Sequence, residues 1–146
     1  MAPRRRRPTA ERPLRTDLGR VDFCLNVRSI ARSREFYGTL GFRKVGGNIE
    51  RKWLIMKRGE FRLGLFQGYI DENLVNFRGG HVGRIVEGLG ERGLKPYNVR
   101  KLAPDGSGSA LLKDPDGNVL FFDSTPRERV WRRKSRGRGD RLAPPR

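Results

Sequence analysis

Apolar residues along the chain alternate between the period of a strand and the period of a helix, and this succession occurs twice. In the first copy, residues 21–27 have a strand composition with rough alternation. Residues 30–40 repeat apolar side chains at helical spacing, after Ser29, a plausible N-cap, and before Gly41. The strands predicted next are 42–45, 51–57 and 61–66, with turns at 46–48 and 58–60.

The second copy keeps the same order. A strand is predicted at residues 74–77, Gly79-Gly80 ends it, and a helix follows with Val82, Ile85, Val86 and Leu89 on one face, ending near Gly93. The last strands are predicted at 95–102, 109–113 and 119–123, with Asp116-Gly117 as the turn of the final hairpin. The pattern predicts an α+β domain of two βαβββ modules over residues 21–125.

The charge lies mostly outside this domain. The chain has 146 residues and a formal net charge of +17, with 35% hydrophobic residues. Residues 1–20 carry seven Arg against Glu11 and Asp17, and residues 126–146 carry eight Arg and Lys134 against Glu128 and Asp140. Both segments are rich in Pro, Gly and Arg, so we expect basic tails that are disordered or ordered only on a partner.

Such tails favour a polyanion as partner, either RNA or DNA, alone or in a ribonucleoprotein. The alternative is a pair of solubilising tails. Trp131 lies among cations, where an aromatic ring can stack on a base, although it could equally pack on the domain. The candidate polyanion-binding residues are Arg4, Arg5, Arg6, Arg7, Trp131, Arg132, Arg133, Lys134, Arg136 and Arg138.

Cysteine use and hydropathy bear on the compartment. Cys24, the single cysteine, lies in an apolar strand, so we expect it to be a small buried residue. A chain with one cysteine cannot form an internal disulfide, which fits a reducing compartment such as the cytoplasm. No stretch has the length of a membrane span, and the basic N-terminus lacks the apolar segment of a secretory signal, so we expect no membrane partner.

Two motifs carry a resemblance to a known family. Asn26-Val27-Arg28-Ser29-Ile30 leading to Glu35-Phe36-Tyr37-Gly38-Thr39-Leu40-Gly41-Phe42 resembles the opening of the glyoxalase/bleomycin-resistance/dioxygenase group, the vicinal oxygen chelate superfamily. Asp114-Pro115-Asp116-Gly117-Asn118 resembles its closing hairpin. The resemblance covers residues 21–125 and implies modules that curl their sheets into a cup, a homodimer, and a divalent metal held in the cup.

The metal positions that this resemblance implies hold few suitable side chains. They fall at Asp22, at the apolar residues 63–65, at Asn73 or Leu74, and at Phe121. Asp22 and His81, the only histidine, remain as candidate ligands. The alternatives are a solvated or paired strand-edge carboxylate for Asp22 and a surface or helix-cap histidine for His81. The residues therefore predict no catalytic group and no cofactor, and they favour a binding protein over an enzyme.

A cup without a metal can still bind a ligand. Trp53, Phe61, Phe66 and Phe121 lie on strands that would line it, with Arg62 nearby, which suits a small aromatic or anionic ligand. The alternative places these rings in the core between sheet and helices.

The sequence thus favours a non-catalytic binding protein of this fold, anchored to nucleic acid or a ribonucleoprotein by Arg-rich tails. Two alternatives stay open. One is a metal-dependent lyase or dioxygenase, and the other is a drug-sequestering protein of the bleomycin-binding type.

Overall fold

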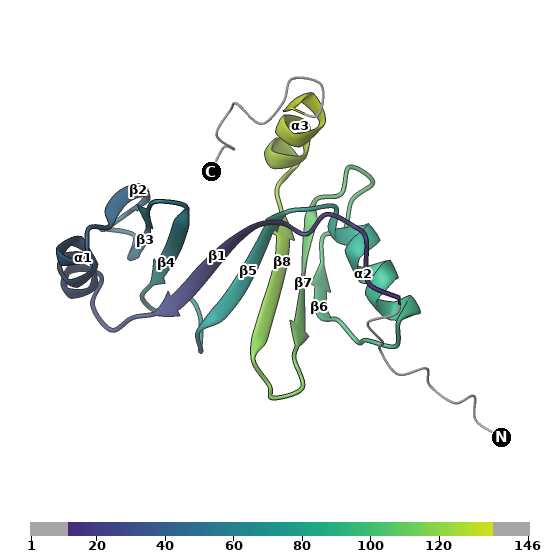
Figure 1. Cartoon of the computed structure of the whole chain (residues 1–146), viewed down its shortest axis with the longest axis horizontal. Helices are drawn as coiled ribbons and strands as arrows, with labels where there is room; N and C mark the ends of the chain where they lie inside the picture. Colours follow the sequence, from purple (N-terminus) through teal and green to yellow (C-terminus); the bar gives the residue numbers. More distant parts are fainter. Residues whose placement is uncertain (1–11, 136–146) are drawn as a thin grey trace. The chain divides into compact units, whose positions relative to one another are not determined.

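The computed structural model describes residues 12–135, which form eight strands and three helices (Figure 1). The first βαβββ succession is β1 (Gly19–Asn26), α1 (Ile30–Thr39), β2 (Arg43–Asn48), β3 (Trp53–Arg58) and β4 (Phe61–Phe66). The second is β5 (Leu74–Gly79), α2 (Val82–Glu91), β6 (Tyr97–Arg100), β7 (Gly108–Lys113) and β8 (Val119–Ser124), and α3 (Pro126–Ser135) follows it. The predicted α+β class and the repeated βαβββ order are confirmed.

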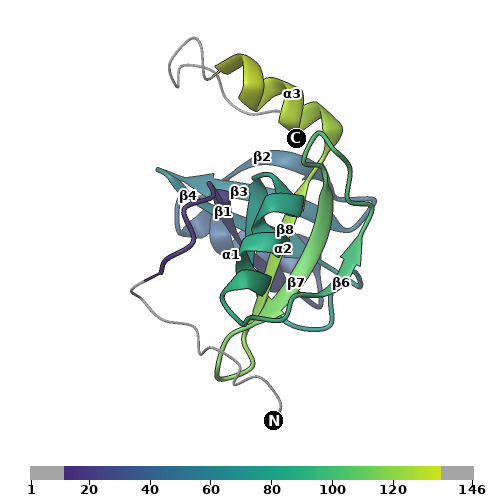
Figure 2. The same cartoon turned by 90° about the vertical axis from the view of Figure 1, so that its right-hand side faces the viewer.

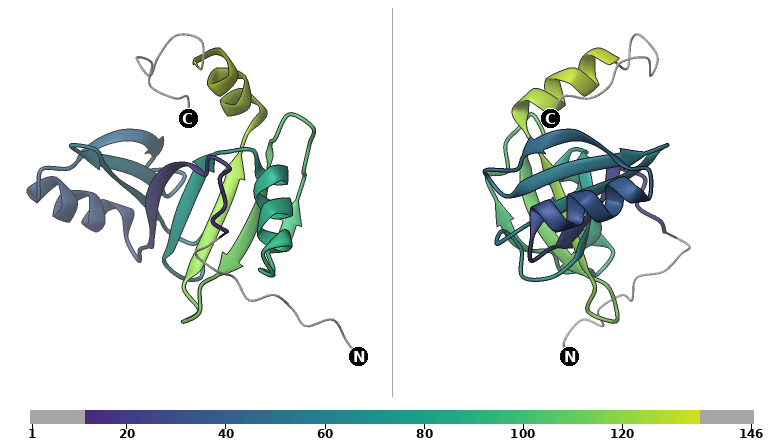
Figure 3. Two further views of the ribbon diagram at one scale, coloured as in Figure 1. Left: turned by 45° about the vertical axis from the view of Figure 1, so that its right-hand side comes forward. Right: turned by 90° about the vertical axis from the view of Figure 1, so that its left-hand side faces the viewer.

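The chain divides into two compact units. The first unit is Val21–Asn76, and the second combines the described parts of Met1–Arg20 and Phe77–Arg146. In the first unit the strand order is β2-β3-β4-β1, with β1 parallel to β4 and the other pairs antiparallel. Helix α1 crosses one face of these strands (Figure 3), and its Ile30 packs with Leu54, Met56 and Leu65.

In the second unit the order is β5-β8-β7-β6, and β6, β7 and β8 are antiparallel. Helix α2 lies over β7 and β8 (Figure 2) and packs Ile85 and Leu89 against Leu112 and Phe122. The predicted apolar face of this helix therefore forms the core of the unit. None of the helices among residues 12–135 is long and apolar enough to cross a membrane.

The residues that precede β1 differ from the expected disordered tail. Leu14 and Leu18 pack against the α2 core, and Arg92, the C-cap residue of α2, donates from its Nη2 to the carbonyl of Pro13 at 3.2 Å. Two apolar side chains spaced four residues apart and the Arg92 hydrogen bond hold this short segment against α2. The ordered unit therefore begins before residue 21, and residues 1–11 lie outside the described part.

Residues 126–135 also differ from the expected tail, because they form α3. Thr125 and Glu128 form a capping box in which the Glu128 backbone N–H donates to Thr125 Oγ1 at 3.2 Å. Glu128 Oε1 in turn accepts from the Thr125 backbone N–H at 3.1 Å. Pro126 occupies the first helical position, where its missing N–H costs nothing. Local capping chemistry overrides the basic composition here, and the helix continues to Ser135.

Two strand boundaries shift for local reasons. β2 continues to Asn48 through the predicted turn, because Gly47 has φ +90° and its Cα faces the Trp53 carbonyl, where an added Cβ would lie 2.5 Å from the oxygen. β6 is shorter than predicted, since Asn98 and Lys101 adopt positive φ and interrupt its register with β7.

Candidate functional site

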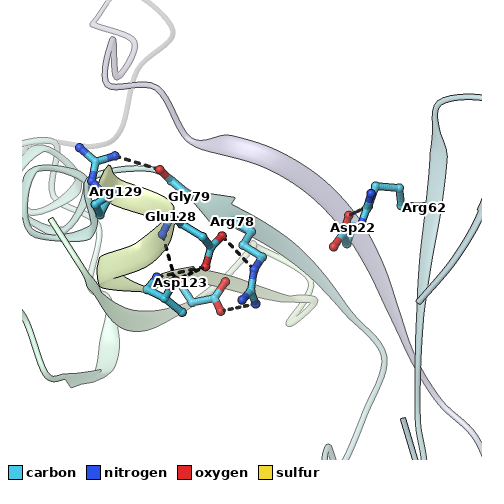
Figure 4. A network of polar contacts seen from close by, with 8 residues as sticks. Asp22, Arg62, Arg78, Gly79, Asp123, Glu128 and Arg129 are labelled. Atoms are coloured by element: carbon cyan, nitrogen blue, oxygen red, sulfur yellow. Dashed lines mark hydrogen bonds and ion pairs between the residues drawn. The ribbon is translucent and has the colours of Figure 1, made fainter. Parts of the chain in front are cut away.

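The position expected to hold the first metal ligand is occupied by an ion pair. Asp22 on β1 is 1% exposed, and its Oδ1 accepts from Arg62 Nε on β4 at 3.0 Å (Figure 4). The guanidinium supplies the positive charge that a buried carboxylate requires. Asp22 and Arg62 thus form a largely buried ion pair.

The other expected ligand positions offer no suitable donor set. Leu63 and Leu65 are apolar, Asn73 Oδ1 accepts from the Asn26 backbone N–H at 2.9 Å, and Phe121 has no donor atom. Among residues 12–135, no group of three or more His, Cys, Asp or Glu side chains could hold a metal ion. These residues do not fit the divalent metal that the fold family implies.

His81 caps a helix. It occupies the N-cap of α2, and its Nδ1 accepts from the Arg84 backbone N–H at 3.2 Å. An accepting Nδ1 places the proton of the neutral ring on Nε2. His81 therefore belongs to the second unit as a capping residue.

The predicted aromatic cup is only partly assembled. Trp53 and Phe66 are paired across β3 and β4 and stack with centroids 6.4 Å apart and an interplanar angle of 5°. Arg62 lies on the same face, because side chains of a strand alternate and it is four residues from Phe66. Phe61 lies on the opposite face, where its ring stacks on Phe23 at 5.4 Å. Phe121 belongs to the second unit, on the face of β8 opposite Phe122 and α2.

A charged network holds α3 to the end of β8. Arg78 on β5 donates from Nη1 to Asp123 Oδ2 and from Nε to Glu128 Oε2, each at 3.0 Å (Figure 4). Glu128 is only 5% exposed and also closes the capping box. Two charge-assisted hydrogen bonds to one guanidinium therefore fix the first turn of α3.

Two further arginines of α3 reach back to the unit. Arg129 donates to the carbonyls of Gly79 and Asp105, each at 2.9 Å, and Figure 4 shows its bond to Gly79. Arg132 Nη1 donates to Asp17 Oδ2 at 2.7 Å. The two carbonyl bonds fix the orientation of Arg129.

These contacts border a cavity of about 350 Å³, here called the arginine cavity. It is lined by His81, Arg84, Pro104, Asp105, Arg129, Val130, Arg132 and Arg133. A second recess shares three of these residues and is lined by Arg15, Thr16, Asp17, His81, Arg84 and Arg129. The guanidinium groups come from the segment before β1, from α2 and from α3, so three distant parts of the sequence contribute positive charge to one region.

The carboxylate of Asp105 in the arginine cavity accepts hydrogen bonds from Ser107. Its Oδ1 accepts from the hydroxyl and the backbone N–H of Ser107, at 2.6 and 2.9 Å. The hydroxyl bond, then the backbone bond, and the nearby charge of Arg129 lower the pKa of Asp105 below its ordinary value of 3.8. At neutral pH Asp105 is an anion whose bonds turn it toward Ser107.

Some of the predicted polyanion-binding residues lie at this site. Arg132 and Arg133 line the cavity, Lys134 is exposed, and Trp131 is half-buried. Arg4, Arg5, Arg6, Arg7, Arg136 and Arg138 lie outside the described residues.

Sequence reasoning missed Arg15, Arg84 and Arg129. A signal for Arg129 was present, because Arg129, Arg132 and Arg133 have the i, i+3, i+4 spacing of one helix face. Only recognition of α3 makes that spacing meaningful.

Comparison with known proteins identifies the fold. No protein-family model and no curated protein matches the chain. Among solved structures, an NAD-dependent benzaldehyde dehydrogenase from Legionella pneumophila aligns with a TM-score of 0.59 at 17% identity, covering 71% of this chain and 97% of its own. A glyoxalase/bleomycin resistance protein/dioxygenase superfamily member from Vibrio splendidus 12B01 aligns at 0.53 and 14% identity, covering 73% and 98%. A hypothetical protein from Bacillus halodurans C-125 aligns at 0.53 and 16%, covering 77% and 96%.

The chain therefore has the fold of the glyoxalase/bleomycin resistance/dioxygenase superfamily, and the resemblance of its two motifs is confirmed at the level of fold. At these identities the similarity carries the fold alone, so function is argued from the site.

Proposed function

We propose that this protein is a non-catalytic binding protein of this fold, and that its second unit anchors it to nucleic acid. The observation that carries the proposal is the convergence of Arg15, Arg84, Arg129, Arg132 and Arg133 on two adjoining recesses. Guanidinium groups match phosphate oxygens in geometry and remain charged at every physiological pH. The carboxylates among the lining residues are Asp17 and Asp105, and both have protein partners.

The surface of α3 extends this positive region. The helix carries Arg127, Arg129, Arg132, Arg133 and Lys134 against Glu128, and Glu128 is committed to Arg78. Arg127 and Lys134 are exposed, and no carboxylate of residues 12–135 forms an ion pair with either. Exposed cations of this kind bind phosphates without regard to sequence, by releasing counterions from the nucleic acid.

The state of the expected metal position supports a binding role. Asp22 is paired with Arg62, Asn73 Oδ1 accepts from the Asn26 backbone N–H, and the other family positions hold apolar side chains. None of the features that support nucleic-acid binding requires a reacting group.

The test is the salt dependence of binding to a short, single-stranded RNA and to the DNA of the same sequence, measured by fluorescence anisotropy. The double variant Arg127→Gln, Lys134→Gln removes two exposed cations from α3. If both contact phosphates, the slope of log K against log salt becomes shallower by about 1.4, since each contact contributes about 0.7 on single strands.

The matched control is Lys44→Gln, Arg51→Gln, which removes two exposed cations from the first unit. It is expected to leave the slope close to that of the wild type. Equal slopes for both double variants would mean that binding follows total charge and not α3, and the proposal would be withdrawn.

A second candidate function is favoured by the stacked pair of Trp53 and Phe66. Tyr69 meets Phe66 edge-on at 6.1 Å and is 59% exposed, and Arg62 lies on the same face of β4. This combination suits a flat, anionic aromatic ligand, as expected of a drug-sequestering protein. If such a ligand is held there, Trp53→Ala weakens its binding in a fluorescence titration while nucleic-acid binding is unchanged.

The homodimer and the cytoplasmic location remain proposals. Exposed apolar side chains of the first unit support self-association, with Phe36 60% and Leu40 52% exposed. Sedimentation equilibrium of the purified protein tests the dimer.

A further inference from the structure

The arginine cavity has an excess of positive charge in a small space. Four arginines line it against one carboxylate, and Asp105, which supplies that carboxylate, is turned to Ser107. Of the four, Arg132 is paired with Asp17, and Arg129 lies beside Asp105, whose pKa its charge lowers. No carboxylate of residues 12–135 forms an ion pair with Arg84 or Arg133. The cavity therefore presents charge that the described residues do not neutralise.

The arrangement of these arginines suits a compact dianion better than a row of singly charged phosphodiesters. Arg84 comes from the first turn of α2, and Arg129 and Arg133 come from α3, so guanidinium groups approach from two elements. Arg129 is held in place by two carbonyl bonds, which lowers the entropy lost when it binds an anion. A phosphate monoester has about two charges at neutral pH and three terminal oxygens, whereas each internal phosphodiester has one charge.

The size and remaining lining of the cavity fit the group attached to such a phosphate. A volume of about 350 Å³ is at the lower end of the range for ligand pockets. Val130 and Pro104 offer apolar contact beside the cations, and the His81 ring is fixed by its bond to the α2 backbone. A sugar or a base can therefore lie against an apolar wall while the phosphate meets the arginines.

We propose that the arginine cavity binds a phosphate monoester and, resting on the nucleic-acid binding proposed above, that it seats the terminal phosphate of the bound strand. The exposed cations of α3 then contact internal phosphates, and the cavity binds the phosphate at the end of the strand. The same chemistry could serve a free nucleotide, and the experiment distinguishes the two sources.

The test compares oligonucleotides of one sequence that carry a 5′-phosphate, a 3′-phosphate or hydroxyls at both ends, each labelled away from the end under test. One terminal phosphate is expected to strengthen binding about tenfold, as for one or two charge-assisted hydrogen bonds. Arg84→Gln and Arg133→Gln are each expected to abolish the difference between the phosphorylated and the hydroxyl strands, and the hydroxyl strand measures how much general binding each variant also loses. Both side chains are exposed, so the variants are expected to fold, and Arg34→Gln on α1 is the matched control.

Each outcome decides between the claims. If all three strands bind equally, the terminal-phosphate inference is overturned and the proposed nucleic-acid binding stands. If no strand binds, the proposed function fails. Calorimetric titration with a nucleoside 5′-monophosphate then tests whether the arginine cavity binds a phosphate monoester at all. If the wild type gives a binding heat that the Arg84→Gln variant lacks, the ligand of the cavity is a free nucleotide. If the wild type gives no heat, the proposed monoester site is overturned as well.

Discussion

Arg78 is the side chain on which the attachment of α3 depends most. It joins Asp123 at the end of β8 to Glu128 in the first turn of the helix, with both bonds at 3.0 Å. Its own side chain is 18% exposed and that of Glu128 is 5% exposed, so solvent screens this pair less than it screens a surface pair.

We therefore predict that Arg78→Met destabilises the protein by about 2–3 kcal/mol, because it leaves the Glu128 carboxylate buried without its guanidinium. Urea unfolding followed by circular dichroism measures the loss. Arg100→Met, which removes an exposed arginine from β6, is the control and should unfold with the wild type. Coinciding curves for the two variants would show that the network does not stabilise α3.

Asp114 organises the closing hairpin. Its carboxylate accepts from the Asn118 side chain at 2.7 Å and from the backbone N–H groups of Asn118 and Asp116 at 2.8 and 2.9 Å. The Asn118 side chain contributes most, and together these bonds hold the pKa of Asp114 below its ordinary value of 3.8. The folded state thus binds a proton at this carboxylate less readily than the unfolded state does.

The pH dependence follows from this direction. The stabilisation from Asp114 is complete above the unfolded pKa of about 3.9 and is lost as the pH falls through the lower folded pKa. We predict that Asp114→Ala lowers Tm at neutral pH, and that the Tm difference from the wild type shrinks as the pH falls from about 4 through the lower folded pKa. Asp116→Ala, in the same turn, is the control. A Tm difference that stays constant down to strong acid would contradict this account.

At the scale of elements, the start of α3 is encoded by a short sequence motif of four residues. Thr125-Pro126-Arg127-Glu128 has the spacing of a capping box, and the structure forms both of its reciprocal bonds. Basic residues Arg132, Arg133 and Lys134 fall in its last turn, where they interact favourably with the helix dipole.

Replacing the cap tests this element separately from the Arg78 network. We predict that Thr125→Ala costs about 1 kcal/mol, because the N–H of Glu128 loses its acceptor. Glu128→Gln keeps a capping-box side chain but removes the charge that pairs with Arg78. Thermal unfolding should show a loss for both variants. A stable Thr125→Ala would mean that the Arg78 network alone holds the helix.

The repeated βαβββ order was predictable because each helix carries a distinct local pattern. Ser29 caps α1 as predicted, and Val82, Ile85 and Leu89 bury the predicted face of α2. α3 was missed because the composition of residues 126–146 as a whole outweighed the four-residue cap at its start. The extension of β2 was missed because Gly46-Gly47-Asn48 is typical of a turn, and only the close approach of β3 turns it into a strand.

At the scale of the whole molecule, the arginine cavity could not be predicted from sequence. Arg15, Arg84 and Arg129 are separated by long stretches of chain, and only the packing of residues 12–18 on α2 brings the first of them to the site. The ion pair of Asp22 and Arg62 could not be predicted either, since the sequence allowed Asp22 to be a metal ligand, a solvated carboxylate or a paired one. Pairing of distant charges depends on register, which composition does not contain.

Truncation tests the packing of the segment before β1 separately from the binding contribution of the terminal arginines. Removing residues 1–11 and 136–146 is predicted to make the salt dependence of nucleic-acid binding shallower, because Arg4–Arg7, Arg136 and Arg138 are lost. Removing residues 1–18 instead should cost about 2–4 kcal/mol, because Leu14 and Leu18 leave the α2 core. Equal stability of the two truncations would contradict the packing described here.

The most direct test of nucleic-acid anchoring is sedimentation of the native protein from a lysate of its own cells, at low salt, at high salt and after nuclease treatment. The account predicts that the protein travels with a particle containing RNA or DNA at low salt and is released by both salt and nuclease. Sedimentation at the mass of a monomer or dimer under all three conditions would contradict it.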